Sequence, residues 1–141
     1  MKPSRFITPP TAASPARIST AKMVELDADG DLVLHVGSEV GKEQDFRVCS
    51  ATMRRASPVW KAMLSGLWKE ARPVDGLWRV DLPADDPWPT GILLAIVHSK
   101  FGPVQQVKSI SDVHEILLVA DKYDMIPVLQ PWAADWVHFR S

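Results

Sequence analysis

The sequence predicts a mixed α+β domain, in which a short three-stranded sheet built around a β-hairpin is capped by a cluster of about five helices. Leu32, Leu34 and Val36 alternate with Val33 and His35, and residues 45–49 form a second strand-like run, so a period of two that is typical of strands occurs twice. Residues 37–44 between them are mostly polar and contain two glycines, as in a hairpin loop. Helical spacing begins at Ser50. A hairpin followed by helices favours an α+β fold over a doubly wound parallel sheet.

The two strands of this hairpin are predicted to share one buried face. Apolar residues occupy every second position of the first strand, and Phe46 and Val48 do the same in the returning strand. Because side chains alternate across a strand, a register slip of one residue would expose both. We therefore expect Phe46 and Val48 to point into the core.

Two short helices are expected after the hairpin. Ser50 is the expected N-cap of the first helix. Ser57 is the expected N-cap of the second, and Pro58 then takes the first helical position, where its missing N–H costs no hydrogen bond. Gly66 is expected to end the second helix. The core face of that helix is predicted from helical spacing to contain Trp60, Met63, Leu64 and Leu67.

A third strand and three further helices complete the predicted order. Residues 77–82 alternate with Trp78, Val80 and Leu82 on one face, and Pro83 ends the strand. A helix is expected to start between Asp86 and Pro89 and to run through Val97. The next is expected to begin at Ser111 as its N-cap, with Val113, Ile116, Leu117 and Ala120 as its apolar stripe. A last helical segment, residues 127–139, contains Pro131, which should kink or restart it.

Length and composition fit one domain preceded by a tail. Residues 1–22 contain four prolines among Ser, Thr and Ala, so we expect a disordered tail, with residues 23–141 forming the domain. A formal net charge of −1 over 141 residues argues against nucleic acid or an anionic membrane as a partner. No apolar run approaches the ~20 residues that span a bilayer. The single cysteine, Cys49, cannot form an internal disulfide, which favours the cytoplasm or the nucleus.

The sequence contains no recognisable catalytic, metal or cofactor site. Asp27 opens a run that is similar to the start of a calcium loop, but the glycine needed five residues later is Leu32. Asp85 and Asp86 form an isolated acidic pair. The histidines lack the spacing of a zinc site; they are His35, His98, His114 and His138. We therefore expect no enzyme activity, no catalytic residue, no metal and no cofactor.

Three motifs in this order resemble the BTB/POZ domain family, and the resemblance covers roughly residues 27–137. Asp31 stands where family members have an acidic residue opening the first strand. Ser57-Pro58-Val59-Trp60 is similar to a helix start of the family, and Ala120-Asp121-Lys122-Tyr123 matches an element of its penultimate helix. The resemblance implies the BTB/POZ fold and a protein–protein interaction module. The tryptophan-rich sequence resembles small fungal BTB proteins in particular.

One departure from the family concerns the charge beside Asp31. Many members carry a basic residue where this chain has Ser50, and that residue joins the strand-one acid in a charged pocket. We expect Ser50 to remove the positive partner, so that a corepressor-type pocket is not formed. The strand and helix that precede the domain in swapped dimers are not recognisable in residues 1–24.

A protein-binding site is expected at Trp68, Lys69 and Glu70. Cullin-binding members of the family have a hydrophobic-x-Glu motif in the loop before the third strand, and these three residues match it. The apolar side chain would anchor in a groove while the carboxylate meets a donor group. The competing interpretation is that Trp68 packs under the loop and Glu70 is solvated. The resemblance thus implies a substrate adaptor or scaffold for a cullin-type ubiquitin ligase; the alternative is a homodimer or other homo-oligomer with no ligase connection.

Overall fold

The computed structural model describes residues 22–66, 72–74 and 76–139. The elements of these residues are, in chain order, β1 (Val24–Glu25), β2 (Leu32–Val36), β3 (Gln44–Val48), α1 (Ser50–Ala56), α2 (Pro58–Ser65), β4 (Trp78–Leu82), α4 (Pro87–Val97), η2 (Gly102–Gln106), α5 (Ile110–Lys122), η3 (Ile126–Trp132) and α6 (Ala133–Trp136). The predicted mixed α+β class is confirmed.

The sheet has four strands in the order β1-β3-β2-β4. The central pair β2 and β3 form the predicted antiparallel hairpin, with Leu34 opposite Phe46. Strand β4 runs parallel to β2, and β1 runs parallel to β3. The expectation of three strands was wrong by one, because a strand of two residues, Val24–Glu25, is too short to leave an alternating pattern in the sequence.

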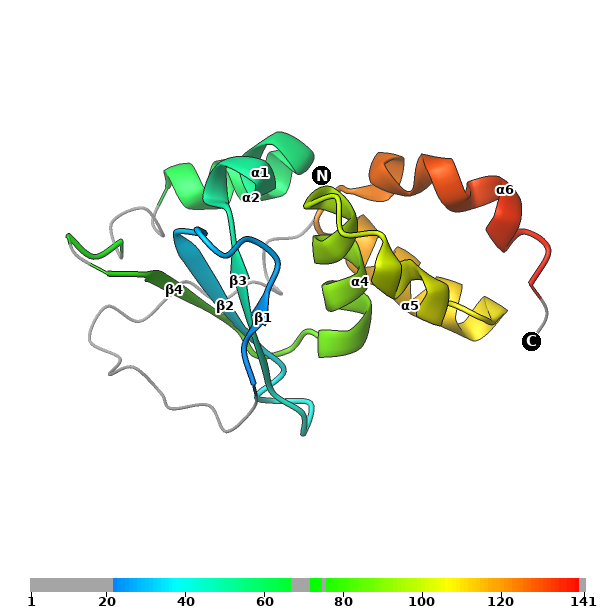
Figure 1. The fold of residues 1–141 in the computed structure, drawn as a ribbon, viewed down its shortest axis with the longest axis horizontal. Helices are drawn as coiled ribbons and strands as arrows, with labels where there is room; N and C mark the ends of the chain where they lie inside the picture. The colour runs from blue at the N-terminus through cyan, green and yellow to red at the C-terminus, as the bar shows by residue number, and fades with distance from the viewer. Residues whose placement is uncertain (1–21, 67–71, 75, 140–141) are drawn as a thin grey trace.

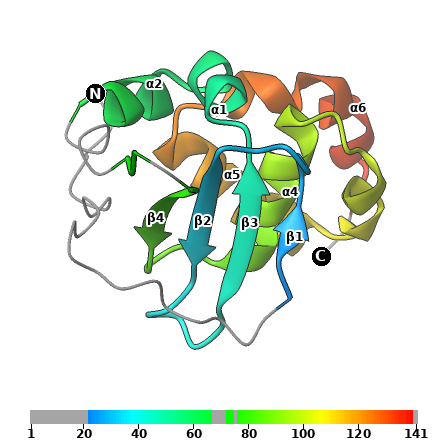
Figure 2. The same ribbon diagram turned by 60° about the vertical axis from the view of Figure 1, so that its left-hand side comes forward.

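Helix α4 lies against one face of the sheet and α5 packs on the far side of α4, while α1 and α2 lie beyond the end at which β3 stops (Figures 1 and 2). The covered face contributes the apolar core. Strand β4 shows the predicted alternation: Trp78, Val80 and Leu82 are buried, and the residues between them are exposed. Both predicted core residues of β3 are buried: Phe46 is 4% exposed and Val48 is 0% exposed. The predicted register of the hairpin is therefore confirmed.

Gly91 lets α4 lie close to the sheet. A Cβ atom at this position would meet the Phe46 ring at 3.0 Å, which is tighter than ordinary van der Waals contact. A glycine inside a helix costs roughly 1 kcal/mol relative to alanine. Because Gly91 has no side chain, the Phe46 ring packs directly against the backbone of α4 and fills the space between α4 and β3.

A buried cluster around Tyr123 joins four separate parts of the chain. The Tyr123 ring stacks on Trp60 of α2 with a centroid distance of 5.4 Å. Its hydroxyl donates a hydrogen bond to Asp85, which also pairs with the Lys122 ammonium at 2.5 Å. Its carbonyl accepts from the Ser57 hydroxyl at 2.5 Å. The connection after α1, helix α2, the turn before α4 and the end of α5 are thus held by one network.

The state of this cluster follows from its burial. Burial first, and then the charge and hydrogen bond of Asp85, raise the pKa of the Tyr123 hydroxyl well above 10.0. The hydroxyl therefore stays protonated and acts as a donor to the carboxylate. Ser57 has two tasks, since its oxygen also accepts from the Trp60 backbone N–H at 3.0 Å and so forms the predicted N-cap of α2.

Two predicted helix starts were wrong. Ser50 is the first residue of α1 rather than its N-cap, because the carboxylate of Asp31 accepts from its backbone N–H at 2.8 Å and from its hydroxyl at 2.6 Å. Helix α5 is capped by Ser109 and not by Ser111. The Ser109 hydroxyl accepts from the Asp112 backbone N–H, and the Asp112 carboxylate accepts from the Lys108 backbone N–H at 3.0 Å. With Ser109 as the N-cap, both of these backbone N–H groups have a hydrogen-bond partner.

The C-terminal segment behaves as its proline predicts. Residues 126–132 form the 3₁₀ segment η3 with Pro131 inside it, and a short α-helix restarts at Ala133. Gly66 ends α2 as expected. Leu67 lies outside the described residues, so its predicted place on the core face of α2 is not described.

We expect Phe46→Ala to lower the free energy of unfolding by about 3–5 kcal/mol, because it removes a buried ring packed against α4. Denaturant melts of wild type and variant measure the change. Val40→Ala, at a residue 39% exposed in the hairpin loop, is the control and should change stability by less than about 0.5 kcal/mol. A loss below ~1 kcal/mol for Phe46→Ala would contradict the packing described for this ring.

Tyr123→Phe should destabilise the fold by about 1–3 kcal/mol, since it keeps the ring but leaves the buried Asp85 carboxylate without its hydroxyl donor. Thermal or denaturant unfolding measures this loss. The double variant Tyr123→Phe/Asp85→Ala should lose less than the sum of the two single variants, because each single change already removes the hydrogen bond between the two side chains. Additive losses would show that the two groups are not coupled.

Candidate protein-binding surface

The predicted binding residues Trp68, Lys69 and Glu70 lie outside the residues that the structure describes. Their chain neighbours are described on both sides: Gly66 ends α2, and Arg72 contacts the sheet. Other residues therefore form the candidate surface in the part of the chain that the structure describes. It consists of a groove and an adjoining basic face.

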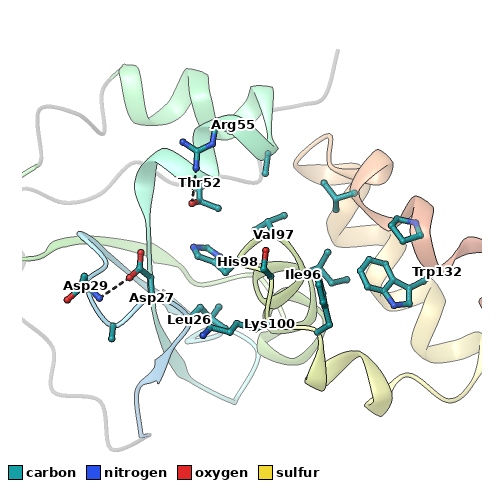
Figure 3. A pocket seen from close by; sticks show the side chains of 16 residues that line it. Leu26, Asp27, Asp29, Thr52, Arg55, Ile96, Val97, His98, Lys100 and Trp132 are labelled. Atoms are coloured by element: carbon teal, nitrogen blue, oxygen red, sulfur yellow. Dashed lines mark hydrogen bonds between the residues drawn. The ribbon is translucent and has the colours of Figure 1, made fainter.

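The groove has a volume of about 870 Å³ and lies between elements that are distant in the sequence. The β1–β2 loop contributes Asp27 and Asp29, and α1 contributes Arg55. The turn after α4 contributes Lys100, and η3 contributes Trp132. Figure 3 shows the acidic residues at one end of this groove, Trp132 at the other end and Arg55 on the α1 side. One wall is thus apolar, and the remaining walls carry both signs of charge.

Aromatic side chains form the apolar wall. Trp132 lies between Phe101, at a ring centroid distance of 5.6 Å, and Trp136, at 6.5 Å. Trp136 is buried, Trp132 is half-buried, and Phe101 remains 53% exposed. Aromatic pairs at these distances attract each other through their ring quadrupoles. The buried Trp136 ring therefore holds Trp132 in place, and Phe101 and Trp132 present apolar surface to the groove.

His98 lies in the groove but is occupied by structural hydrogen bonds. Its Nε2 atom accepts from the backbone N–H of Cys49 at 3.1 Å, and its Nδ1 atom donates to the Leu94 carbonyl at 2.8 Å. Burial lowers the pKa of His98 below 6.5 and outweighs the effect of the carbonyl. The ring is therefore neutral and joins the start of α1 to the end of α4, which removes it as a candidate general base.

The basic face lies on α1 and α2, next to the groove. We define it as Arg54, Arg55 and Lys61, which line a second hollow of about 460 Å³ together with Ala51 and Pro58. Residues 50–65 contain these three cations and no acidic residue. Arg55 lines both hollows, so the basic face and the groove form one continuous surface.

The expected loss of a positive partner for Asp31 was wrong. Arg72 approaches the Asp31 carboxylate at 3.1 Å and lies over the Trp78 ring at 5.2 Å. Burial alone would raise the pKa of Asp31, but hydrogen bonds from Ser50 and the charge of Arg72 outweigh it and lower the pKa below 3.8. The carboxylate therefore stays charged. The sequence could not indicate Arg72, because 41 residues separate it from Asp31.

A third hollow, of about 470 Å³, lies at the sheet edge formed by β1. Its lining includes Val24, Phe46, Ile92 and the Trp88 side chain. The Trp88 indole N–H donates to the side chain of Gln106 at 2.9 Å, which fixes the ring at the rim. This hollow is mainly apolar and carries no cluster of groups suited to catalysis.

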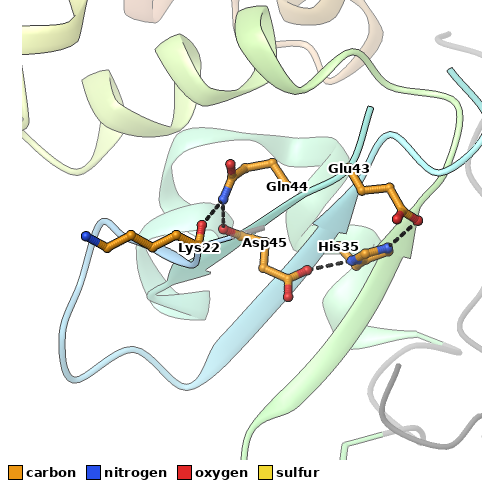
Figure 4. A network of polar contacts seen from close by, with 5 residues as sticks. All are labelled: Lys22, His35, Glu43, Gln44 and Asp45. Carbon is orange, nitrogen blue, oxygen red and sulfur yellow. Dashed lines mark hydrogen bonds and ion pairs between the residues drawn. The ribbon is translucent and has the colours of Figure 1, made fainter. Parts of the chain in front are cut away.

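His35 is held between two carboxylates (Figure 4). Its Nδ1 atom lies 2.5 Å from Asp45, its cross-strand neighbour, and its Nε2 atom lies 3.1 Å from Glu43. Asp81 of β4 occupies the register position on its other side. Burial lowers the pKa of His35, but the two carboxylates outweigh burial and raise it above 6.5. His35 and Asp45 are each 5% exposed, so the contact is a buried ion pair when the ring is protonated.

The acidic residues considered as metal ligands are used by the fold. Asp85 belongs to the Tyr123 cluster, whereas Asp86 caps α4 and pairs with Lys42 at 3.2 Å. Asp27 accepts from the Asp29 backbone N–H at 2.9 Å, as in a tight turn. Within the described ranges, no group of three or more His, Cys, Asp or Glu residues could hold a metal ion.

Comparisons with known protein families and with curated proteins find no match for this chain. In the part of the chain that the structure describes, no helix has both the length and the apolar character needed to cross a membrane.

The raised pKa of His35 predicts a dependence of stability on pH. A group whose pKa is higher in the folded state contributes its full stability below the unfolded pKa of about 6.5, and that contribution disappears as the pH rises through the folded value. The stability difference between wild type and His35→Gln should therefore be largest below pH ~6 and shrink at higher pH. Urea melts across this range measure it, with the exposed His114→Gln as the control. A difference that grows with pH would contradict the assignment.

Proposed function

We propose that this chain is a BTB/POZ-type module that binds proteins, and that it acts as a substrate adaptor or scaffold for a cullin-type ubiquitin ligase in the cytoplasm or nucleus. The observation that carries the first part is the contact between two motifs. The Ser57 hydroxyl and the Trp60 ring both meet Tyr123, so a helix-start motif and a penultimate-helix motif 66 residues apart form one cluster. The packing of the two motifs against each other explains why both occur in the same sequence.

Binding is favoured over catalysis by the way in which titratable groups are used. Asp31, His35, Asp85 and His98 are each held by short contacts to other parts of the protein. Asp31 contacts a hydroxyl, that of Ser50, but neither residue lines any of the three hollows described above, whereas acyl- or phosphoryl-transfer chemistry would require a nucleophile in such a site. The groove and the basic face instead present cations, aromatic rings and the carboxylates of Asp27 and Asp29 over one continuous surface, which suits recognition of a partner.

The ligase connection rests on Trp68, Lys69 and Glu70. These residues connect α2 to β4, on the chain between Gly66 and Arg72. An apolar anchor followed by a carboxylate can occupy a pocket and pair with a donor on a cullin. The interpretation in which Trp68 packs into the domain makes a different prediction for stability, so the two can be separated by experiment.

The second candidate function is self-association without a ligase. Helix α5 favours it, because it carries three exposed apolar residues while its buried side faces the core: Ile110 is 41% exposed, Leu117 is 38% exposed and Leu118 is 59% exposed. Such a stripe on a second copy of the chain could pack against its counterpart. Mass measurement in solution, with Leu118→Glu as the disrupting variant, tests this candidate.

We expect Trp68→Ala to weaken binding to a cullin N-terminal domain by about 2 kcal/mol or more, or roughly thirtyfold, with little change in stability. Calorimetric titration and denaturant melts on the same samples measure both quantities. Lys69→Ala is the matched control, and Glu70→Lys should weaken binding further with an effect that shrinks in salt. A lowered melting temperature for Trp68→Ala would favour the packed position. Wild type that shows no cullin affinity at high micromolar concentration would end the ligase proposal.

A further inference from the structure

The surface of α1 and α2 carries an excess of positive charge that the packing of the domain does not explain. The whole chain has a net charge of −1, yet residues 50–65 carry Arg54, Arg55 and Lys61 and no acidic residue. Arg55 and Lys61 are exposed, and Arg54 is partly exposed. A local excess of one sign in a nearly neutral protein raises the local concentration of oppositely charged partners.

These cations are held only weakly by the described part of the chain. Within the described ranges, no carboxylate lies within 4.0 Å of any of the three, in contrast to Lys42, Arg72 and Lys122. Arg54 and Arg55 make only long hydrogen bonds, at 3.5 and 3.4 Å, to hydroxyls of their own helix. Long contacts to neutral groups hold a guanidinium weakly, so its donors remain available for a carboxylate.

The basic face continues into the groove through Arg55. From there the surface leads to the aromatic wall, where Phe101 is half exposed and Trp132 is braced by Trp136. A ligand that touches both parts therefore meets cations first and apolar rings next. The carboxylates of Asp27 and Asp29 lie at the opposite end of the groove and limit how far a negative ligand can extend.

We propose that the groove and the basic face together bind an acidic protein segment that carries an apolar anchor residue. The anchor enters the groove against Phe101 and Trp132, and acidic residues beside it pair with Arg54, Arg55 and Lys61. This inference rests on the proposed protein-binding function and names the chemistry of the partner.

A protein segment fits these observations better than a nucleic acid or a membrane. The four cations of the groove and the basic face are too few for the extended phosphate contacts that dominate nucleic-acid affinity, and the acidic end of the groove repels a continuing phosphate backbone. An aromatic wall next to a group of cations is instead typical of a protein interface, in which an anchor residue supplies affinity and the surrounding charges supply selectivity.

The test is selection from a displayed library of random peptides on the immobilised full chain. Peptides selected by wild type should be enriched in Asp and Glu next to an aromatic or aliphatic residue. The most enriched peptide, labelled with a fluorophore, should then bind with an affinity that falls as salt is added. Absence of acidic enrichment, or affinity that is insensitive to salt, would overturn the proposal.

Variants locate the site. Arg54→Glu/Arg55→Glu should weaken binding of the selected peptide by about tenfold or more through loss of attraction and gain of repulsion. Phe101→Ala should weaken it through the anchor, and its exposure should leave stability nearly unchanged. Arg79→Glu, at an exposed arginine of β4 outside both hollows, is the matched control and should bind like wild type. Equal effects of Arg79→Glu and the double variant would overturn the site.

Two further measurements keep this inference separate from the ligase proposal. A labelled DNA oligonucleotide and phosphatidylserine vesicles should bind more weakly than the selected peptide, and stronger binding of either would overturn the assignment to a protein partner. Arg54→Glu/Arg55→Glu should retain the cullin affinity of wild type, because Trp68 is untouched. Wild type that binds the cullin but selects no acidic peptide would overturn this inference alone, and wild type that binds an acidic peptide but no cullin would overturn the ligase proposal alone.

Discussion

The buried carboxylate of Asp85 is the constraint around which the helices of this domain are arranged. Removing a carboxylate from water costs several kcal/mol unless charge and hydrogen bonds replace the lost solvation. Lys122 supplies the charge and Tyr123 supplies a hydroxyl donor, both from the end of α5. Since Tyr123 also stacks on Trp60 and accepts from Ser57, the position of Asp85 fixes α5 against the turn before α4 and both against α2.

The same network explains which parts of the fold could be predicted from the sequence. Alternating residues in β2, β3 and β4 indicated strands because the period of two is local. Ser57 was found as a cap because its partner, the Trp60 N–H, lies three residues away. The bonds from Tyr123 to Ser57 and Asp85 connect residues far apart in the chain, and no local pattern contains that information. Both motifs could be recognised in the sequence, but only the structure shows that they contact each other.

The errors have the same origin. Ser50 has the right chemistry for an N-cap, but a carboxylate 19 residues earlier reaches its N–H and its hydroxyl. Ser111 and Ser109 are both good caps, and the reciprocal bond from Lys108 to Asp112 decides between them. For the candidate surface, the sequence placed Arg54 and Arg55 next to each other but did not indicate that Trp132 would lie across the same groove. A cluster of charges within one helix can be predicted from neighbouring residues in the sequence, whereas a groove formed by four separate segments cannot.

Asp31 has a consequence for the order in which the domain folds. Helix α1 has only seven residues, and a helix of fewer than about 12 residues is marginal in water without tertiary support. Its first N–H is bound by a carboxylate that is in place only after the β2–β3 hairpin has brought Asp31 next to Ser50. We therefore expect the hairpin to form in the transition state and α1 to follow it. Replacing Asp31 by Asn would then accelerate unfolding and leave the refolding rate nearly unchanged, whereas a large decrease in the refolding rate would mean that the helix forms with the hairpin.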